Sequence, residues 1–149
     1  ELSDYLEALI NQQQQFSCAV FSLKIPERKL KVYTDKLSLQ HIVVNLLMNA
    51  IKFCKEGEIS LRIERAGKDL LIEVSDTGIG IAEQHLEKIF DAFYQVSHGH
   101  RRKYGGAGLG LSIVKKLTEE LNGQIIVESE PEHGSRFKVV LPDVIREKT

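Results

Sequence analysis

Three polar side chains recur at helical spacing in the first half of the chain. Asn45, Asn49 and Lys52 are separated by four and three residues, so in a helix turning about 100° per residue they form one narrow stripe. An asparagine oxygen is the kind of hard ligand that Mg²⁺ prefers, and a lysine supplies a point charge for phosphate. The same pattern also describes an ordinary solvated helix face. The stripe alone is therefore compatible with two interpretations, a site for a metal-triphosphate and an ordinary solvated surface.

A carboxylate continues the inward register of a strand-like run. Leu70, Ile72 and Val74 alternate with more polar residues, and Asp76 is the next member of the series. Alternate strand residues face one side, so we expect Asp76 on the buried face. There it could accept from the amino group of adenine, whereas the guanine carbonyl would oppose it at a cost of about 1 to 3 kcal/mol. A turn-capping aspartate is the alternative, and the apolar register argues against it.

Two glycine-rich stretches follow. Gly78 and Gly80 let the backbone turn and approach a ligand, with Ile79 and Ile81 as apolar walls. Residues 105–111 lead directly into a predicted helix, whose free N–H groups could cradle phosphate. This second stretch is no dinucleotide fingerprint, because no strand precedes it, and it lacks the Gly-Lys-Ser/Thr ending of a P-loop.

Hydrophobic periodicity predicts the elements that must position these side chains. Helical spacing predicts helices over residues 2–16, 36–54, 82–90 and 109–121. Asp35 is the expected cap of the second helix. Strand-like runs cover residues 19–23, 31–33, 59–64, 70–74, 124–129 and 136–141. We expect one domain over residues 1–149, an α+β two-layer sandwich with helices packed on one face of a mixed sheet.

Composition limits the partners. The 20 basic and 21 acidic residues leave a net charge of -1, which provides no field for nucleic acid or a membrane surface. No apolar run approaches the roughly 20 residues of a membrane span, so we expect a soluble, cytosolic domain without membrane contact. The start, without Met and within an amphipathic stretch, suggests a fragment of a longer protein.

Cysteines and histidines offer no separate chemistry. Cys18 and Cys54 lie in apolar patterns, which predicts two buried thiols rather than a disulfide or metal pair. The five histidines lie in predicted helices, in the polar stretch 91–107 or in a turn, and none has the sequence context of a phosphate acceptor.

The motifs, in this order, resemble those of the ATP-binding domain shared by histidine kinases, gyrase, MutL and the related chaperone. Residues 40–53 resemble the N box, 76–80 the first glycine box, 89–94 the F box, 106–111 the second glycine box and 134–137 the short glycine motif before the last strand. The resemblance spans nearly the whole chain and implies the Bergerat-type ATP-binding fold, which is the same two-layer sandwich.

The resemblance also implies a role for each matching residue. Asn49 would ligate Mg²⁺, Asn45 and Lys52 would support metal and phosphates as the rest of the catalytic set, Phe53 would flank the base and Asp76 would bind its amino group. Residues 91–107 would form the ATP lid. The implied ATP-binding set also contains Gly78, Gly80, Ile81, Phe93, Lys103, Tyr104, Gly106, Ala107, Gly108, Leu109, Gly110 and Leu111.

Within that family the chain most resembles the catalytic ATP-binding domain of a sensor histidine kinase. Members that hydrolyse ATP, and the compact serine-kinase relatives, carry Glu where Asn45 stands, and an amide cannot act as that base. The implied function is donation of the γ-phosphate of Mg-ATP to a histidine on the acceptor domain of the same kinase, with a response regulator receiver domain as the indirect partner. Without its acceptor domain the chain is expected to phosphorylate nothing. The domain would be cytoplasmic, in a sensor that could itself be membrane-bound.

Two departures and two alternatives accompany this interpretation. Ala107 replaces a frequent hydroxyl residue, and Gln95 stands where many members carry a lid arginine; the basic residues 101–103 could supply that charge. A non-catalytic nucleotide-sensing or interaction module derived from a histidine kinase remains the alternative function. The triplet Asp76-Thr77-Gly78 also matches dimeric aspartic proteases, but Ile79 and the long helix do not suit that all-strand fold.

Overall fold

A computed structural model of the chain describes residues 2–14, 18–25, 30–92 and 110–145. The elements, in chain order, are α1 (Leu2–Gln14), β1 (Val20–Lys24), α2 (Lys36–Phe53), β2 (Glu58–Ala66), β3 (Asp69–Asp76), α3 (Glu83–Leu86), α5 (Gly110–Glu120), β4 (Gln124–Glu130) and β5 (Gly134–Leu141). The sheet has five strands in the order β1-β2-β3-β5-β4. β1 and β2 run parallel, and the other neighbours are antiparallel.

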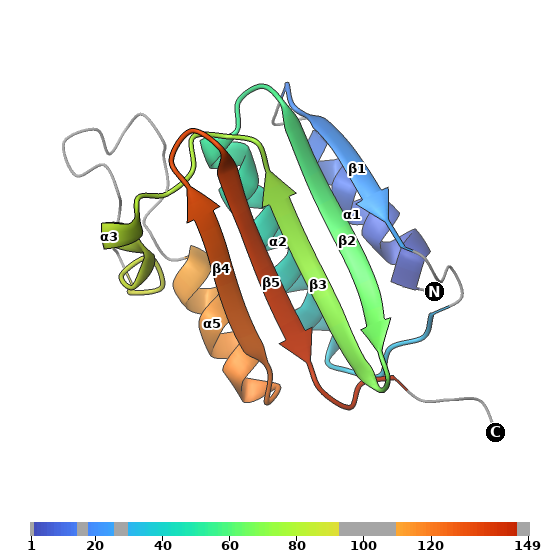
Figure 1. The fold of residues 1–149 in the computed structure, drawn as a ribbon. Helices are drawn as coiled ribbons and strands as arrows, with labels where there is room; N and C mark the ends of the chain where they lie inside the picture. The colour runs from blue at the N-terminus through green and yellow to red at the C-terminus, as the bar shows by residue number, and fades with distance from the viewer. Residues whose placement is uncertain (1, 15–17, 26–29, 93–109, 146–149) are drawn as a thin grey trace.

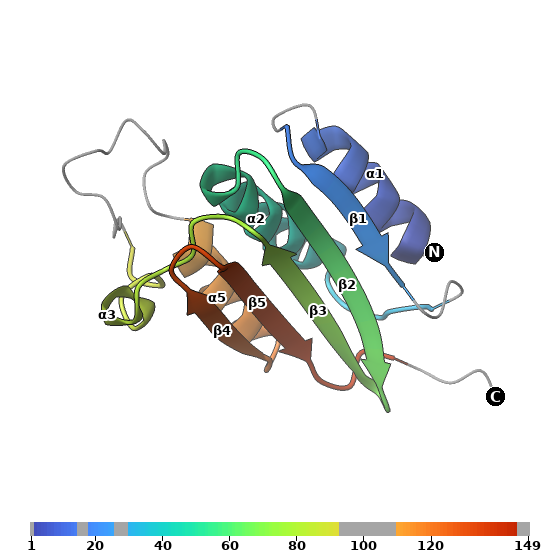
Figure 2. The same ribbon diagram turned by 45° about the horizontal axis from the view of Figure 1, so that its top comes forward.

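The predicted two-layer sandwich with a mixed sheet is confirmed. Helices α1, α2 and α5 lie against one face of the sheet, and the other face of the strands is uncovered by any described helix (Figures 1 and 2). Within the described ranges, no helix combines the length and apolar character needed to cross a membrane.

Helix α2 is the central element of the helical layer. Its cap is the one predicted, because the Asp35 carboxylate accepts a hydrogen bond from the Ser38 N–H at 3.0 Å. One broad face enters the core, formed by Leu39, Ile42, Val43, Leu46, Leu47, Ala50 and Ile51. The side chains of Asn45, Asn49 and Lys52 lie outside that face and are partly exposed.

Strands β2 and β3 show the alternation that the sequence predicts. In β3 every second residue from Leu70 to Asp76 is buried, and Asp76 pairs with Ile59 of β2. Their connecting turn places Gly67 in the left-handed region at φ 63°. On the opposite face, the Glu73 carboxylate lies 3.6 Å from Arg136 and 4.0 Å from Lys138 of β5. The sheet therefore has one apolar face and one charged face.

One predicted element is absent from the sheet and another is shorter in the structure. Residues 31–33 form no strand of the sheet, because Val32 makes an isolated bridge to Ile145 and the Tyr33 N–H donates to the Val144 carbonyl at 2.7 Å. The helix predicted over residues 82–90 is only α3, followed by turns. Ala82 provides no side-chain acceptor at its start, so the first turn lacks the cap that sustains a longer helix.

The prediction of two buried thiols is correct for one of them. Cys54 is buried at the end of α2, whereas Cys18 is exposed. Cys18 lies in a bend before β1, an edge strand of the sheet in which every second residue is exposed. Only one face of this edge strand is turned toward the core, so an apolar run in the sequence does not mean that every residue in it is buried.

Helix α5 contains a buried hydroxyl whose removal should stabilise the fold. Thr118 is fully buried, and its Oγ1 has no hydrogen-bond partner among the described residues. The substitution Thr118→Val puts a methyl group in place of this desolvated hydroxyl, so we expect the free energy of unfolding to rise by about 1 kcal/mol. Urea denaturation measures this value. The matched control is Thr77→Val, because the Thr77 hydroxyl accepts from the Glu58 N–H at 3.0 Å and its loss should destabilise. An equal loss of stability in both variants would contradict the prediction.

Candidate functional site

The polar stripe of α2 faces the start of α5. The Asn45 Nδ2 donates to the His41 carbonyl at 2.7 Å, and a Cβ added to Gly110 would lie 3.3 Å from the Asn45 Oδ1. Gly110 therefore allows the first turn of α5 to come close to α2. Leu111, the next residue, packs against the core. The N-terminal N–H groups of α5 and the Asn45 side chain of the α2 stripe consequently belong to one region.

Lys52 lies at the end of this stripe in a partly desolvated position. Burial lowers the pKa of its ammonium group. Its Nζ lies 5.5 Å from the centre of the Phe53 ring, within the range of a cation–π interaction. A lysine held this way would gain from an added anion, because a negative charge would compensate its partial loss of hydration.

Asp76 is the buried carboxylate of the site. It is 7% exposed, and its Oδ1 accepts from the Gly78 N–H at 2.8 Å. Burial raises its pKa, while the backbone N–H groups of Gly78 and Ser135 oppose the rise. An ionised carboxylate has about four acceptor positions, so two N–H groups leave capacity for a further donor. The predicted inward direction of Asp76 is confirmed.

The two glycines after Asp76 make close backbone contacts within the protein. The Ile79 N–H donates to the Phe53 carbonyl at 3.1 Å, and a Cβ on Gly78 would overlap that same carbonyl. Gly80 has φ +70°, and a Cβ there would overlap the Glu130 carbonyl. The close approaches that the structure shows are therefore to the end of α2 and the end of β4. Ile79 is 46% exposed and Ile81 is 3% exposed.

Two serines next to Asp76 were missing from the predicted set of site residues. Ser135 pairs with Asp76 across β5 and β3, and Ser129 pairs with Ser135 across β4 and β5. The signal available in the sequence is the register of β4, where Ile125 and Val127 face the core and Ser129 follows them. A polar residue at an inward position is the same kind of signal that identified Asp76.

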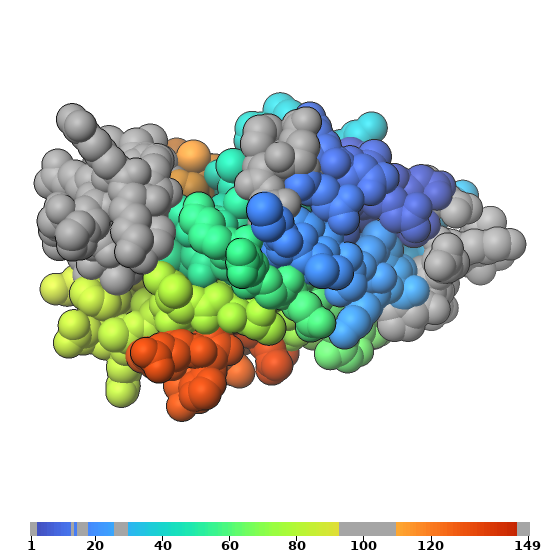
Figure 3. Space-filling view, turned by 90° about the horizontal axis from the view of Figure 1, so that it is seen from above, coloured from blue at the N-terminus to red at the C-terminus, as the bar shows by residue number. Residues whose placement is uncertain are grey.

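The described site residues gather at one edge of the molecule. The α2 residues of the set are Asn45, Asn49, Lys52 and Phe53. Asp76 ends β3 and the glycine loop follows it, and Gly110 and Leu111 start α5; Figure 1 shows these elements. Figure 3 looks onto this edge, where the yellow-green loop after β3 lies beside the red turn between β4 and β5. Outside the described residues lie Phe93, Lys103, Tyr104, Gly106, Ala107, Gly108 and Leu109, so their predicted roles stay predictions.

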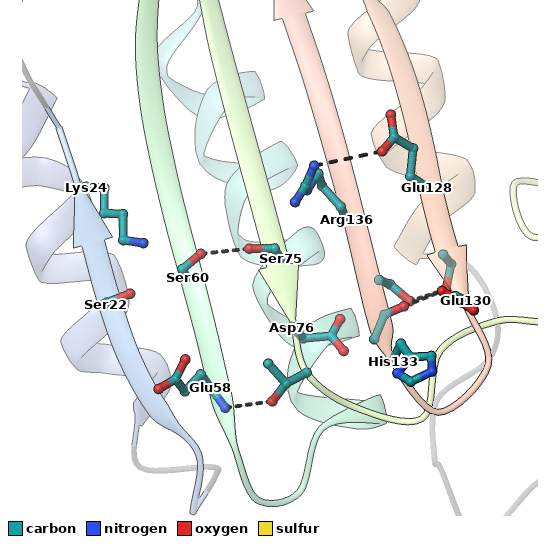
Figure 4. A pocket seen from close by; sticks show the side chains of 14 residues that line it. Ser22, Lys24, Glu58, Ser60, Ser75, Asp76, Glu128, Glu130, His133 and Arg136 are labelled. Carbon is teal, nitrogen blue, oxygen red and sulfur yellow. Dashed lines mark hydrogen bonds and ion pairs between the residues drawn. The ribbon is translucent and has the colours of Figure 1, made fainter.

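A polar groove also crosses the uncovered face of the sheet (Figure 4). Ser22, Ser60, Ser75 and Arg136 line it, and the hydroxyls of Ser60 and Ser75 lie 2.7 Å apart. The groove reaches Asp76 at one end but includes no residue of α2. It therefore shares only Asp76 with the predicted set of site residues.

The sequence has relatives of known class. Residues 34–145 match the family described as histidine kinase-, DNA gyrase B-, and HSP90-like ATPase. The chain is 39% identical over 140 residues to the sensor histidine kinase RcsC of Escherichia coli K12, covering 94% of this chain and 14% of that protein. It is 46% identical over 118 residues to the autoinducer 2 sensor kinase/phosphatase LuxQ of Vibrio vulnificus, covering 75% of this chain and 14% of LuxQ.

Solved structures share the fold. Full-length ShkA in complex with AMPPNP superposes with a TM-score of 0.87 at 24% identity, over 99% of this chain and 31% of that one. The mycobacterial sensor histidine kinase MprB gives 0.82 at 23% identity, over 97% of both chains. The catalytic domain of histidine kinase ThkA gives 0.75 at 26% identity, over 93% of this chain and 92% of that one.

Two glycines with similar backbone conformations allow a matched test of the loop packing. Gly80→Ala would combine left-handed strain at φ +70° with overlap on the Glu130 carbonyl, so we expect a loss of about 3 kcal/mol in unfolding free energy. Gly67→Ala has φ +63° and open space around the new methyl, so it should lose only about 1 kcal/mol. Urea denaturation of both variants measures the difference. Equal losses would show that packing at Gly80 adds nothing to the backbone strain.

The buried carboxylate predicts a pH dependence of stability. The pKa of Asp76 is raised in the folded protein, so its protonation favours folding below the ordinary aspartate pKa. That contribution is lost as the pH rises through the raised pKa. We therefore expect the wild type to lose stability relative to Asp76→Asn as the pH rises across this acid window, and the difference to stay constant above it. Denaturant unfolding at a series of pH values measures the difference, and an opposite slope would contradict the raised pKa.

Proposed function

The chain belongs to the histidine kinase-, DNA gyrase B-, and HSP90-like ATPase family, and from this premise we propose that it binds Mg-ATP at the edge formed by α2, β3 and α5. We further propose that it is the catalytic domain of a sensor histidine kinase, which passes the γ-phosphate to a histidine on a separate acceptor domain. The single observation that carries the proposal is the Asp76 carboxylate, buried beside the asparagine-lined helix α2.

Asp76 would select the base. Its carboxylate is fixed by the Gly78 and Ser135 N–H groups and retains acceptor capacity for one more donor. The exocyclic amino group of adenine is such a donor. Guanine presents a carbonyl oxygen there, and two buried acceptors facing each other cost about 1 to 3 kcal/mol. Phe53 lies directly next to this loop and would flank the base.

The α2 stripe and the start of α5 would hold the metal and phosphates. Asn49 and Asn45 offer amide oxygens, which suit Mg²⁺, and Lys52 offers a partly desolvated positive charge. The first turn of α5 adds backbone N–H groups with the favourable end of the helix dipole. When bound, Mg²⁺ neutralises charge on the phosphate oxygens. The residues of this chain would then position the γ-phosphate for transfer.

The phosphate acceptor would come from elsewhere. The chain spans 14% of the length of RcsC and of LuxQ, so the activity of a whole kinase is proposed from a part. Among the described histidines, His41 and His133 are exposed on α2 and in the β4–β5 turn, and His85 lies on α3. We propose an acceptor domain of the same kinase as partner, and a response regulator receiver domain as the subsequent recipient. Asn45 in place of a glutamate supports transfer over hydrolysis.

Titration calorimetry tests the nucleotide site. We expect ATP and ADP to bind in the presence of Mg²⁺, and GTP to bind about tenfold more weakly or worse. Asp76→Asn replaces one of the two carboxylate oxygens with an NH₂ donor, and with the remaining oxygen engaged by the backbone N–H groups it should abolish the preference for adenine. Asn49→Ala should remove the Mg²⁺-dependent part of the ATP affinity. The matched controls are Asp4→Asn and Asn11→Ala, which change exposed residues of α1. Folded protein that binds no adenine nucleotide would overturn the proposal.

A second assay separates a kinase from a nucleotide-sensing module. Labelled ATP is added to the chain alone and to the chain mixed with the acceptor domain of its own kinase. We expect label on the acceptor histidine in the mixture and none on the chain alone. Nucleotide binding without transfer would leave the sensing module as the function.

A further inference from the structure

The Ser129 hydroxyl is the centre of a small hydrogen-bond network on the loop side of the site. Its Oγ accepts from the Ile81 N–H at 2.7 Å and donates to the Gly134 carbonyl at 2.9 Å. The Ser135 hydroxyl lies 2.8 Å away. Because Ser129 has one hydrogen and gives it to Gly134, the Ser135 hydroxyl must donate to Ser129. Ser129 thereby uses its one donor and two acceptor positions.

This network joins the two segments that clamp the Asp76 carboxylate. Gly78, in the loop that ends at Ile81, donates one N–H to Asp76. The backbone of Ser135, at the start of β5, donates the other. Figure 4 shows Asp76 at the end of β3, beside the turn that carries His133. The Glu132 N–H also donates to the Ile79 carbonyl at 2.6 Å. The loop after β3 and the β4–β5 turn are therefore held as one unit around the carboxylate.

A serine at position 129 gives up the apolar burial that a larger hydrophobic side chain would provide there. Ser129 occupies an inward position of β4, after Ile125 and Val127, where an apolar residue would extend the core. Ile81 is 3% exposed, so without the Ser129 oxygen its N–H would lose its partner in a buried place. A hydroxyl at this position thus serves the geometry of the loop.

We propose that Ser129 is a positioning residue for base recognition: it touches no nucleotide, and it fixes Ser135 and Ile81 so that the Asp76 carboxylate meets the amino group of adenine. This inference rests on the proposed function, because it requires adenine at Asp76. Its specific consequence is that Ser129 affects the contribution of the amino group more than the affinity for the rest of the nucleotide.

The experiment compares ADP with purine riboside diphosphate, in which hydrogen replaces the amino group. The ratio of the two dissociation constants isolates the amino group from phosphate and sugar contacts. For Ser129→Ala we expect this preference for ADP to fall by about three- to tenfold. Ser129→Thr retains the hydroxyl and should restore the preference. The matched control is Ser60→Ala, which removes another cross-strand serine pair, at 2.7 Å from Ser75, away from the loop.

Each outcome separates this inference from the proposed function. If the wild type binds no ADP, the proposed function fails. If the wild type prefers ADP and Ser129→Ala keeps that preference, or weakens both nucleotides equally, Ser129 has only a structural role and the inference is overturned. If Ser129→Ala does not fold by circular dichroism, Ser129→Cys takes its place as a near-isosteric variant with weaker hydrogen bonds, and a preference equal to that of the wild type would again overturn the inference.

Discussion

The hydrogen bond from the Ile79 N–H to the Phe53 carbonyl joins the two halves of the candidate site. Phe53 is the last residue of α2, and the last carbonyls of a helix point beyond its final turn, where groups from outside the helix can reach them. The loop after β3 supplies an N–H donor to this carbonyl, and Gly78 permits the approach because any side chain there would overlap the carbonyl. The distance between the α2 stripe and Asp76 is therefore set by backbone contacts. The polar side chains of the site do not have to hold the two parts together.

Much of the fold was predictable because local patterns and tertiary packing agree. The inward alternation of β3, the Asp35 cap and the end of α5 at Glu120 all follow from short stretches of sequence. Just after α5, Asn122 has φ 62° and the Gly123 N–H donates to the Thr118 carbonyl. The predictions were wrong where residues distant in the sequence determine the pairing or the exposure of a segment. Val32 pairs with Ile145 instead of extending a ladder, and Cys18 is exposed because nothing described covers the outer edge of β1.

The residues that could bind a ligand were predictable from the sequence, but the contacts that hold them in place were not. Asp76 and the α2 stripe are recognisable because residue type and spacing together suggest ligands. The sequence predicts that Gly78 and Gly80 allow close approach to a ligand, whereas the structure shows their close contacts with the Phe53 and Glu130 carbonyls, which lie far away in the sequence. From the sequence, Ser129 is only one residue of a predicted strand. Its hydrogen bonds depend on the pairing of β4 with β5 and on the position of the loop after β3.

The strand order has a consequence for the time at which the site forms during folding. β5 is the last strand in the sequence, yet it lies between β3 and β4 in the sheet. A β2–β3 hairpin can pair early, because its strands are adjacent in the chain. The Asp76 clamp must wait for β5, and the bond between Ile81 and Ser129 closes over 48 residues. Affinity for a base at Asp76 would accordingly arise in the last stage of folding, after most of the core has formed.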